Sequence, residues 1–138
     1  MHLIDANIFL ELNLDQENSE ESRKYLSKVG KGEIKAIVTL FHADTIALTM
    51  QYNGVQSNSI KQFYHDLSRF RGLEVIEAGL FNRIKSVENF GNTGLDDSII
   101  LQTYRDYDVD ILVSYDDDFD SFEDVERKTP SEVLENDE

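Results

Sequence analysis

Residues 94–120, GLDDSIILQTYRDYDVDILVSYDDDFD, contain the elements that decide the fold. Residues 95–107 carry Ile and Leu at helical spacing, whereas residues 110–114, DILVS, form a short apolar run typical of a buried strand. An acidic pair opens the helix, and an acidic cluster follows the strand. The stretch therefore predicts a helix that leads into a central strand with a strongly acidic carboxyl end.

The same alternation of short apolar runs and helical patterns extends along the whole chain. Further strands are predicted at residues 2–4, 36–38 and 73–76, with a possible edge strand at Val125. Helices are predicted at residues 8–14, 39–52, 57–71 and 80–90, with one ending at Gly30 and a short one from Pro130. We therefore expect a single α/β domain over residues 1–138. It should be a three-layer α/β/α sandwich around a mostly parallel sheet of four to five strands, with its last few residues disordered.

Composition restricts the class of protein. The chain has 138 residues, 40% of them hydrophobic, which suits one globular domain. It contains no cysteine, so disulfides, thiol catalysis and thiolate metal sites are excluded. No apolar run approaches the ~18 residues that a membrane span needs. Since a charge already occurs at position 5, we expect no secretory signal and a cytoplasmic protein.

The net charge of −15, from 28 acidic and 13 basic residues, is unusual. Such a surface repels nucleic acid, because non-specific binding depends on Lys and Arg neutralising phosphates. Either the protein does not bind nucleic acid, or it works in concentrated salt, where such repulsion is screened. We favour the second, halophilic hypothesis. The only local lysine excess is at Lys28, Lys31 and Lys35.

Acidic residues stand where parallel sheets bind ligands, beyond the carboxyl ends of the strands. Asp5 follows the first strand, Asp116 follows DILVS, Asp96 and Asp97 open the preceding helix, and Asp44 lies in the helix after the second strand. Carboxylates are preferred ligands of Mg²⁺ and Mn²⁺. Without a cation, such a cluster cannot remain fully ionised. The pattern predicts a metal site.

Asp44 is interpreted as functional because of its predicted position on a helix. Helical geometry projects it between Leu40 and Ala47, beside Leu48, on the apolar face. A carboxylate there is costly to bury unless it is paired. The candidate partners are a metal, His42 or a basic residue.

The other acidic residues also have structural explanations. Asp5 precedes a helix and fits an N-cap. Asp96 and Asp97 fit a favourable interaction with a helix N-terminus. Residues 116–120 fit a solvated turn. Asn7 either orients the Asp5 carboxylate or makes a local turn hydrogen bond.

Four segments together resemble the PIN domain family. They are LIDANIFLEL at residues 3–12, IVTLFHADTIAL at 37–48, the quoted stretch at 94–120, and KTPSEVLEND at 128–137. The likeness covers nearly the whole chain, and its specific part is the order and spacing of the motifs. In the second motif, the hydroxylated Thr39 precedes a helix that carries an acidic residue.

The resemblance implies which residues form the site. It implies an acidic quartet that binds Mg²⁺ or Mn²⁺, accompanied by one further ligand and several accessory residues. Asp97 is preferred over Asp96 because the apolar pair follows it at the family's spacing. The second motif usually carries Glu, and the shorter Asp44 departs from it. The quartet is Asp5, Asp44, Asp97 and Asp116; the further ligand is Asp118; the accessory residues are Asn7, Thr39, Ser114 and Asp96.

The resemblance also implies a function. Family members hydrolyse RNA phosphodiester bonds with Mg²⁺ or Mn²⁺, and a standalone domain resembles the toxin of a type II toxin–antitoxin pair. An antitoxin is then expected over the acidic groove, and helices 57–71 and 80–90 offer surfaces for a homodimer or an antitoxin. Two alternatives remain: a non-catalytic PIN-like interaction module, and an RNA-processing nuclease outside toxin systems.

Two other classes fit the sequence less well. A receiver domain needs a Lys after its fifth strand, and none follows DILVS. A haloacid-dehalogenase-type phosphatase needs Asp-x-Asp, where this chain has Asn7 in the second position.

Overall fold

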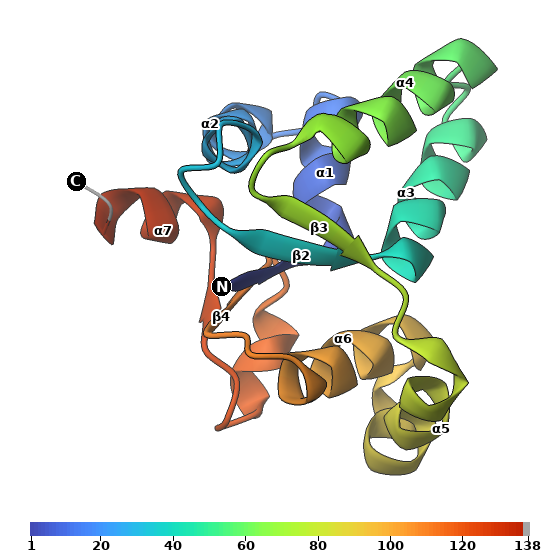
Figure 1. The fold of residues 1–138 in the computed structure, drawn as a ribbon, viewed down its shortest axis with the longest axis vertical. Helices are drawn as coiled ribbons and strands as arrows, with labels where there is room; N and C mark the ends of the chain where they lie inside the picture. Colours follow the sequence, from blue (N-terminus) through green and yellow to red (C-terminus); the bar gives the residue numbers. More distant parts are fainter. Residues whose placement is uncertain (137–138) are drawn as a thin grey trace.

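The protein is built around an all-parallel sheet of five strands (Figure 1). The computed structural model describes residues 1–136. The strand order is β3-β2-β1-β4-β5, so the first strand is central. The strands are β1 (His2–Ile4), β2 (Ala36–Thr39), β3 (Leu73–Ile76), β4 (Ile111–Val113) and β5 (Arg127–Lys128).

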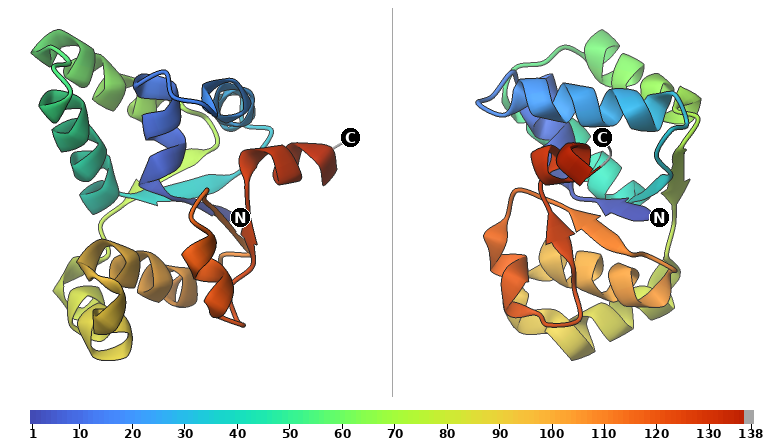
Figure 2. Two further views of the ribbon diagram at one scale, coloured as in Figure 1. Left: turned by 180° about the vertical axis from the view of Figure 1, so that it is seen from behind. Right: turned by 90° about the vertical axis from the view of Figure 1, so that its left-hand side faces the viewer.

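Helices cover both faces of the sheet (Figures 1 and 2). The helices are α1 (Ala6–Asn13), α2 (Ser19–Gly30), α3 (Leu40–Tyr52), α4 (Ser57–Arg69), α5 (Gly79–Phe90), α6 (Leu95–Asp106) and α7 (Pro130–Asn136), with 3₁₀ turns η1 (Gly91–Thr93) and η2 (Asp117–Ser121). Helices α1 to α4 and α7 lie on one face, and α5, α6 and η2 on the other. This arrangement confirms the predicted α/β/α sandwich.

Two hydrophobic cores fill the space between the sheet and its helices. Successive strand residues point to opposite faces. Ile4 and Val113 therefore enter the core beneath α1 to α4, while Leu3 and Leu112 enter the core beneath α6. Phe119 of η2 is buried in the second core. The turn after β4 is thus anchored by its own apolar residue.

Most predicted elements are confirmed to within two residues at their ends, but the edge strand is not where it was expected. Val125 lies in a turn, where its N–H donates to the carbonyl of Phe122 at 3.1 Å. The edge strand is Arg127–Lys128. The prediction of disorder at the last few residues concerns chiefly positions 137–138, which lie outside the described residues. Within residues 1–136, no helix has the length and apolar character needed to cross a lipid bilayer.

The parallel arrangement determines where a site can form. All five strands end at the same edge of the sheet, so the residues that follow them are neighbours in space. Asp5 follows β1, Thr39 ends β2, and Ser114 follows β4. Segments more than 100 residues apart thereby meet at this carboxyl edge.

Candidate active site

The hydroxyl group of Ser114 joins the ends of β1 and β4. It donates to Oδ2 of Asp5 at 2.6 Å and accepts from the backbone N–H of Asp116 at 3.0 Å. The Asn7 amide donates to the same Asp5 oxygen at 3.2 Å and lies 3.3 Å from Ser114 Oγ. Asn7 thus contacts the Asp5 carboxylate, and its role in orienting that group stays a prediction. Ser114 fixes the Asp5 carboxylate relative to the turn that begins at Asp116.

Asp5 is confirmed as an N-cap, and its role in a metal site stays a prediction. Its Oδ1 accepts from the N–H of Ala6 at 2.7 Å, so it caps α1. Its side chain is also buried against the network around Ser114. Burial raises the pKa of this carboxyl to about 6, although the hydrogen bonds from Ser114 and Ala6 oppose the rise. The cap therefore accounts for one oxygen only, and the other faces the site.

Asp97 is a carboxyl group whose pKa is raised by burial and by several neighbouring carboxylates. It lies half-buried in the first turn of α6, whereas its neighbour Asp96 is exposed. Burial, followed by the charges of Asp96, Asp5, Asp116 and Asp118, raises its pKa to about 7. The structure thus brings predicted residues from three segments within electrostatic reach of one another.

The turn after β4 supplies the densest group of oxygen donors. Carboxylate oxygens of Asp116, Asp117 and Asp118 lie within 4.8 Å of one another. Asp116 also caps η2, with its Oδ1 accepting from the N–H of Asp118 at 3.0 Å. Asp117 was not among the predicted residues. These hard oxygen ligands, together with the raised pKa of Asp97, fit Mg²⁺ or Mn²⁺.

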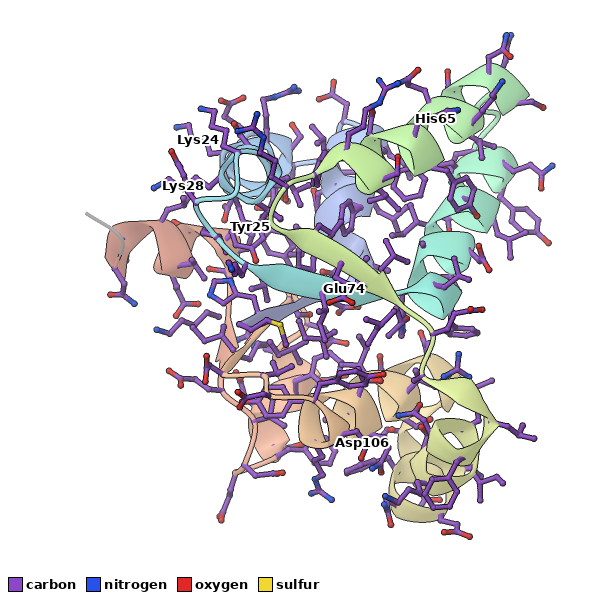
Figure 3. All side chains as sticks on the ribbon, viewed as in Figure 1. Lys24, Tyr25, Lys28, His65, Glu74 and Asp106 are labelled. Carbon is purple, nitrogen blue, oxygen red and sulfur yellow. The ribbon has the colours of Figure 1, made fainter. Side chains whose placement is uncertain are left out.

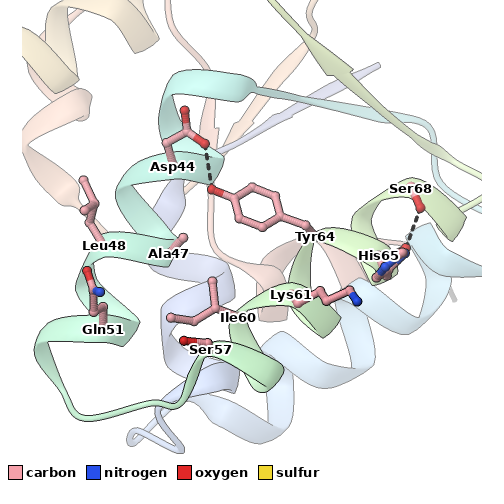
Figure 4. A pocket seen from close by; sticks show the side chains of 10 residues that line it. All are labelled: Asp44, Ala47, Leu48, Gln51, Ser57, Ile60, Lys61, Tyr64, His65 and Ser68. Atoms are coloured by element: carbon pink, nitrogen blue, oxygen red, sulfur yellow. Dashed lines mark hydrogen bonds between the residues drawn. The ribbon is translucent and has the colours of Figure 1, made fainter.

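The prediction that Asp44 occupies the apolar face of its helix is wrong. The buried stripe of α3 is Ala43, Ile46, Ala47 and Met50, so the helix is rotated relative to the predicted face and Leu48 is exposed. Asp44 is itself exposed, and its Oδ1 accepts from the hydroxyl of Tyr64 on α4 at 2.7 Å (Figure 4). It lines a groove between α3 and α4. The structure does not bring it into the cluster around Asp97.

Helix α3 instead directs His42 toward the carboxyl edge. Thr39 caps α3 by accepting from the His42 N–H at 3.0 Å, and the imidazole is buried. Its Nε2 lies 3.2 Å from the backbone carbonyl of Asp96, which only accepts, so Nε2 carries the proton. Its Nδ1 then accepts from the Thr39 hydroxyl. Burial lowers the pKa of His42 to about 4, so the ring is neutral at pH 7.

The sequence contained a signal for this role. Thr39 and His42 stand three residues apart, the spacing at which an N-cap meets the third residue of a helix. From the sequence, His42 was a candidate partner of Asp44. Its actual partners are Thr39 and Asp96, and it ties α3 to the first turn of α6.

The lysine excess of the sequence lies along and after α2. Figure 3 shows Lys24 and Lys28 on the outer side of this helix. Basic and acidic side chains together line a groove between α2 and α7: Arg23, Lys24, Lys28 and Lys31 with Glu21, Glu33 and Glu135. The groove is therefore of mixed charge, and adaptation to high salt stays a prediction.

Comparison with known proteins finds similarity in fold. No protein-family model and no curated protein sequence matches the chain. The structure is similar to VapC20 of Mycobacterium tuberculosis, described as a sarcin-ricin loop cleaving toxin. The TM-score is 0.75 at 8% identity, covering 91% of this chain and 98% of that one.

Two further solved structures are similar. A toxin–antitoxin complex from Klebsiella pneumoniae has a TM-score of 0.68 at 18% identity, covering 94% of this chain and 98% of that one. VapBC2 from Rickettsia felis, bound to a DNA fragment from its promoter, has a TM-score of 0.57 at 15% identity, covering 93% and 97%. The fold is that of VapC toxins, which agrees with the resemblance to PIN domains.

Proposed function

We propose that this protein is a Mg²⁺- or Mn²⁺-dependent endoribonuclease that hydrolyses phosphodiester bonds in RNA. The observation that carries the proposal is that carboxylates following β1, opening α6 and following β4 act on one another at one edge of the sheet: burial, followed by the charges of Asp96, Asp5, Asp116 and Asp118, raises the pKa of Asp97 to about 7. Like charges gathered in this way are stabilised by a bound cation. The similarity of the fold to VapC toxins supports the same activity.

Asp5, Asp97 and Asp116 would hold the cation, with Asp118 beside them. A bound Mg²⁺ or Mn²⁺ supplies Lewis acidity, which lowers the pKa of water and offsets the charge of the phosphate. Asp44 is left out of this set, because it faces Tyr64 across the α3–α4 groove.

The protein's own side chains have separable roles in this proposal. Ser114 and Asn7 hold one oxygen of Asp5 in a fixed direction. In the metal-free protein Asp97 has a pKa of about 7 and is partly protonated at neutral pH, so binding of a cation there would release a proton. The exposed Asp96 adds negative charge that keeps Asp97 basic. Thr39 acts at a distance by orienting His42.

We further propose that the protein is the toxin of a toxin–antitoxin pair. Two of the similar structures are toxin complexes with their antitoxins, which supports an antitoxin partner. Such a partner would cover the acidic edge with a basic side chain. The groove of about 770 Å³ between α3 and α4, lined by Leu48, Ile60 and Tyr64 among others, offers an adjoining apolar surface.

A homodimer is proposed through α5. Leu80 is 77% exposed, Phe81 70%, Ile84 48% and Val87 56%, an unusual set of large apolar side chains on one helix. Exposed apolar patches of this kind mark interaction sites. A second copy of the chain is the proposed occupant.

The activity is tested by incubating single-stranded RNA with Mn²⁺ and the wild-type protein, Asp5→Asn or Asp97→Asn. We expect cleavage by the wild type alone. Asp66→Asn, on the exposed side of α4, removes the same charge outside the site and serves as the matched control. Equal cleavage by Asp5→Asn would indicate a contaminating nuclease. Asp44→Asn tests the sequence prediction directly, and the structure leads us to expect full activity.

A non-catalytic interaction module is the second candidate, favoured by the position of Asp44 outside the cluster and by the charge of −15. It would cleave no RNA and show no rise in melting temperature with Mn²⁺. An RNA-processing nuclease outside toxin systems would cleave RNA but would have no antitoxin to bind.

A further inference from the structure

Arg127 of β5 bridges the two ends of the acidic turn. Its Nε donates to Oδ1 of Asp120 at 2.8 Å, and its Nη2 donates to Oδ2 of the same residue at 2.9 Å. Its Nη1 donates to the backbone carbonyl of Ser114 at 3.0 Å. The Arg127 side chain is only 12% exposed, so these bonds are partly shielded from water. One planar guanidinium group thus holds both ends at once.

The segment between these two attachment points carries the densest oxygen donors. Asp116, Asp117 and Asp118 lie between Ser114 and Asp120, with carboxylate oxygens within 4.8 Å of one another. Adjacent like charges repel, which favours opening of the turn. Inside the turn, the Ser114 hydroxyl accepts from the Asp116 N–H. Arg127 closes the turn from outside.

We propose that Arg127 is a positioning residue that holds the turn after β4, so that the carboxylates of Asp116 and Asp118 keep the positions that the proposed cation site requires. The inference rests on the proposed function, since it concerns the same cation site. It extends that proposal to a basic residue that neither touches the cation nor was predicted from the sequence.

Because Arg127 is positively charged, the proposal can be tested by whether removing Arg127 weakens or tightens cation binding. If Arg127 acted only through its charge, its guanidinium group would repel the divalent cation, so removing it should tighten cation binding. If Arg127 instead holds the turn, removing it should weaken binding despite the gain in negative charge. The two explanations therefore predict changes in opposite directions.

The experiment measures Mn²⁺ affinity of the full chain by electron paramagnetic resonance, together with amide hydrogen exchange at residues 114–120 without metal. The variants are Arg127→Gln and Arg127→Lys. The matched control is Arg105→Gln, because Arg105 pairs with Asp124 at 2.9 Å and its guanidinium group lies over the ring of Phe90. This substitution also removes a paired arginine, but not one that bonds to Ser114 or Asp120.

We expect Arg127→Gln to weaken Mn²⁺ binding about tenfold, the lower end of the effect of outer-shell partners. Arg127→Lys retains the charge but cannot hold both oxygens of Asp120 and the Ser114 carbonyl, so it should also weaken binding. Both variants should speed exchange in the turn, and Arg105→Gln should change neither quantity.

Several results would overturn the inference. They are equal or tighter Mn²⁺ binding by Arg127→Gln, full affinity in Arg127→Lys, or unchanged exchange at residues 114–120. Absence of Mn²⁺ binding by the wild type would instead overturn the proposed function. Faster exchange in the variants would then still show that Arg127 holds the turn, but not that it serves a cation site.

Discussion

Replacing Asp5 by Asn should stabilise the metal-free protein while abolishing its proposed activity. The rise in the Asp5 pKa from 3.8 to about 6 means that the folded state disfavours the ionised carboxyl by about 3 kcal/mol, at ~1.4 kcal/mol per pKa unit. Asn removes this charge, but its hydrogen bonds with Ser114 and Ala6 are weaker, which lowers the free energy of unfolding by about 1 kcal/mol. The expected net gain is about 2 kcal/mol, or ~6 °C in melting temperature for a chain of this size.

The pH dependence distinguishes this cause from a general packing effect. The folded pKa lies above the unfolded one, so the folded state binds more protons between pH 3.8 and about 6. Wild-type stability is therefore lost as pH rises through this window and stays low above it. The advantage of Asp5→Asn should be absent below pH 4 and complete above pH 6.

Thermal unfolding with excess chelator, from pH 4 to 8, measures the effect. Asp120→Asn is the control of opposite sign, because the hydrogen bonds from Arg127 hold the pKa of Asp120 below its usual range. That variant should lose stability at neutral pH. If Asp5→Asn also lost stability at pH 8, or gained the same stability at pH 4, then the buried Asp5 charge would not destabilise the folded state as proposed.

Three further predictions concern other parts of the molecule. The pKa of His42 is about 4 in the folded protein and 6.5 in the unfolded chain, so the stability due to its neutral ring is lost as pH falls from 6.5 to about 4. In an Asp5→Asn background, His42→Gln should therefore reduce the fall in melting temperature over this pH range. An unchanged fall would contradict this role of His42. Phe81, 70% exposed on α5, should contribute to the proposed homodimer; Phe81→Arg should give a monomer in light scattering, whereas a dimer of unchanged stability would place the interface elsewhere. The net charge of −15 predicts that melting temperature rises steeply between ~0.01 and ~1 M salt, where the Debye length falls from ~30 to ~3 Å; full stability in dilute buffer would contradict adaptation to high salt.

The fold could be predicted from the sequence because its strands and helices have clear periodicities. The buried runs around Ile4, Val38 and Val113 predicted parallel strands, and Thr39, which precedes a predicted helix, caps α3. The edge strand was misplaced because Arg127–Lys128 is only two residues long and carries no apolar pattern. Its pairing with β4 is determined by backbone hydrogen bonds, which the side-chain pattern does not encode.

The position of a candidate residue could be predicted where it follows a strand or opens a helix, as for Asp5 and Asp97, but not within α3. Asp5 directly follows β1, and Asp116 lies three residues after the end of β4, so topology places both at the carboxyl edge. The direction of Asp44 depended on the rotation of α3 about its own axis. Leu48 suggested the wrong side of the helix, because it is exposed, whereas Ala43 and Ile46 pack inward. Packing of α3 against α1 and α4 decides this rotation, and such packing between helices is not visible in periodicity.

The bond between Ser114 and Asp5 spans 109 positions of the chain, and this separation has a consequence for biosynthesis. Asp5 leaves the ribosome first, but β1 acquires its β4 neighbour only after residues 111–113 have emerged. Prematurely terminated products that stop before β4 would carry Asp5 without Ser114, the acidic turn or Arg127. Under the proposed ribonuclease function, incomplete copies would therefore lack a complete site.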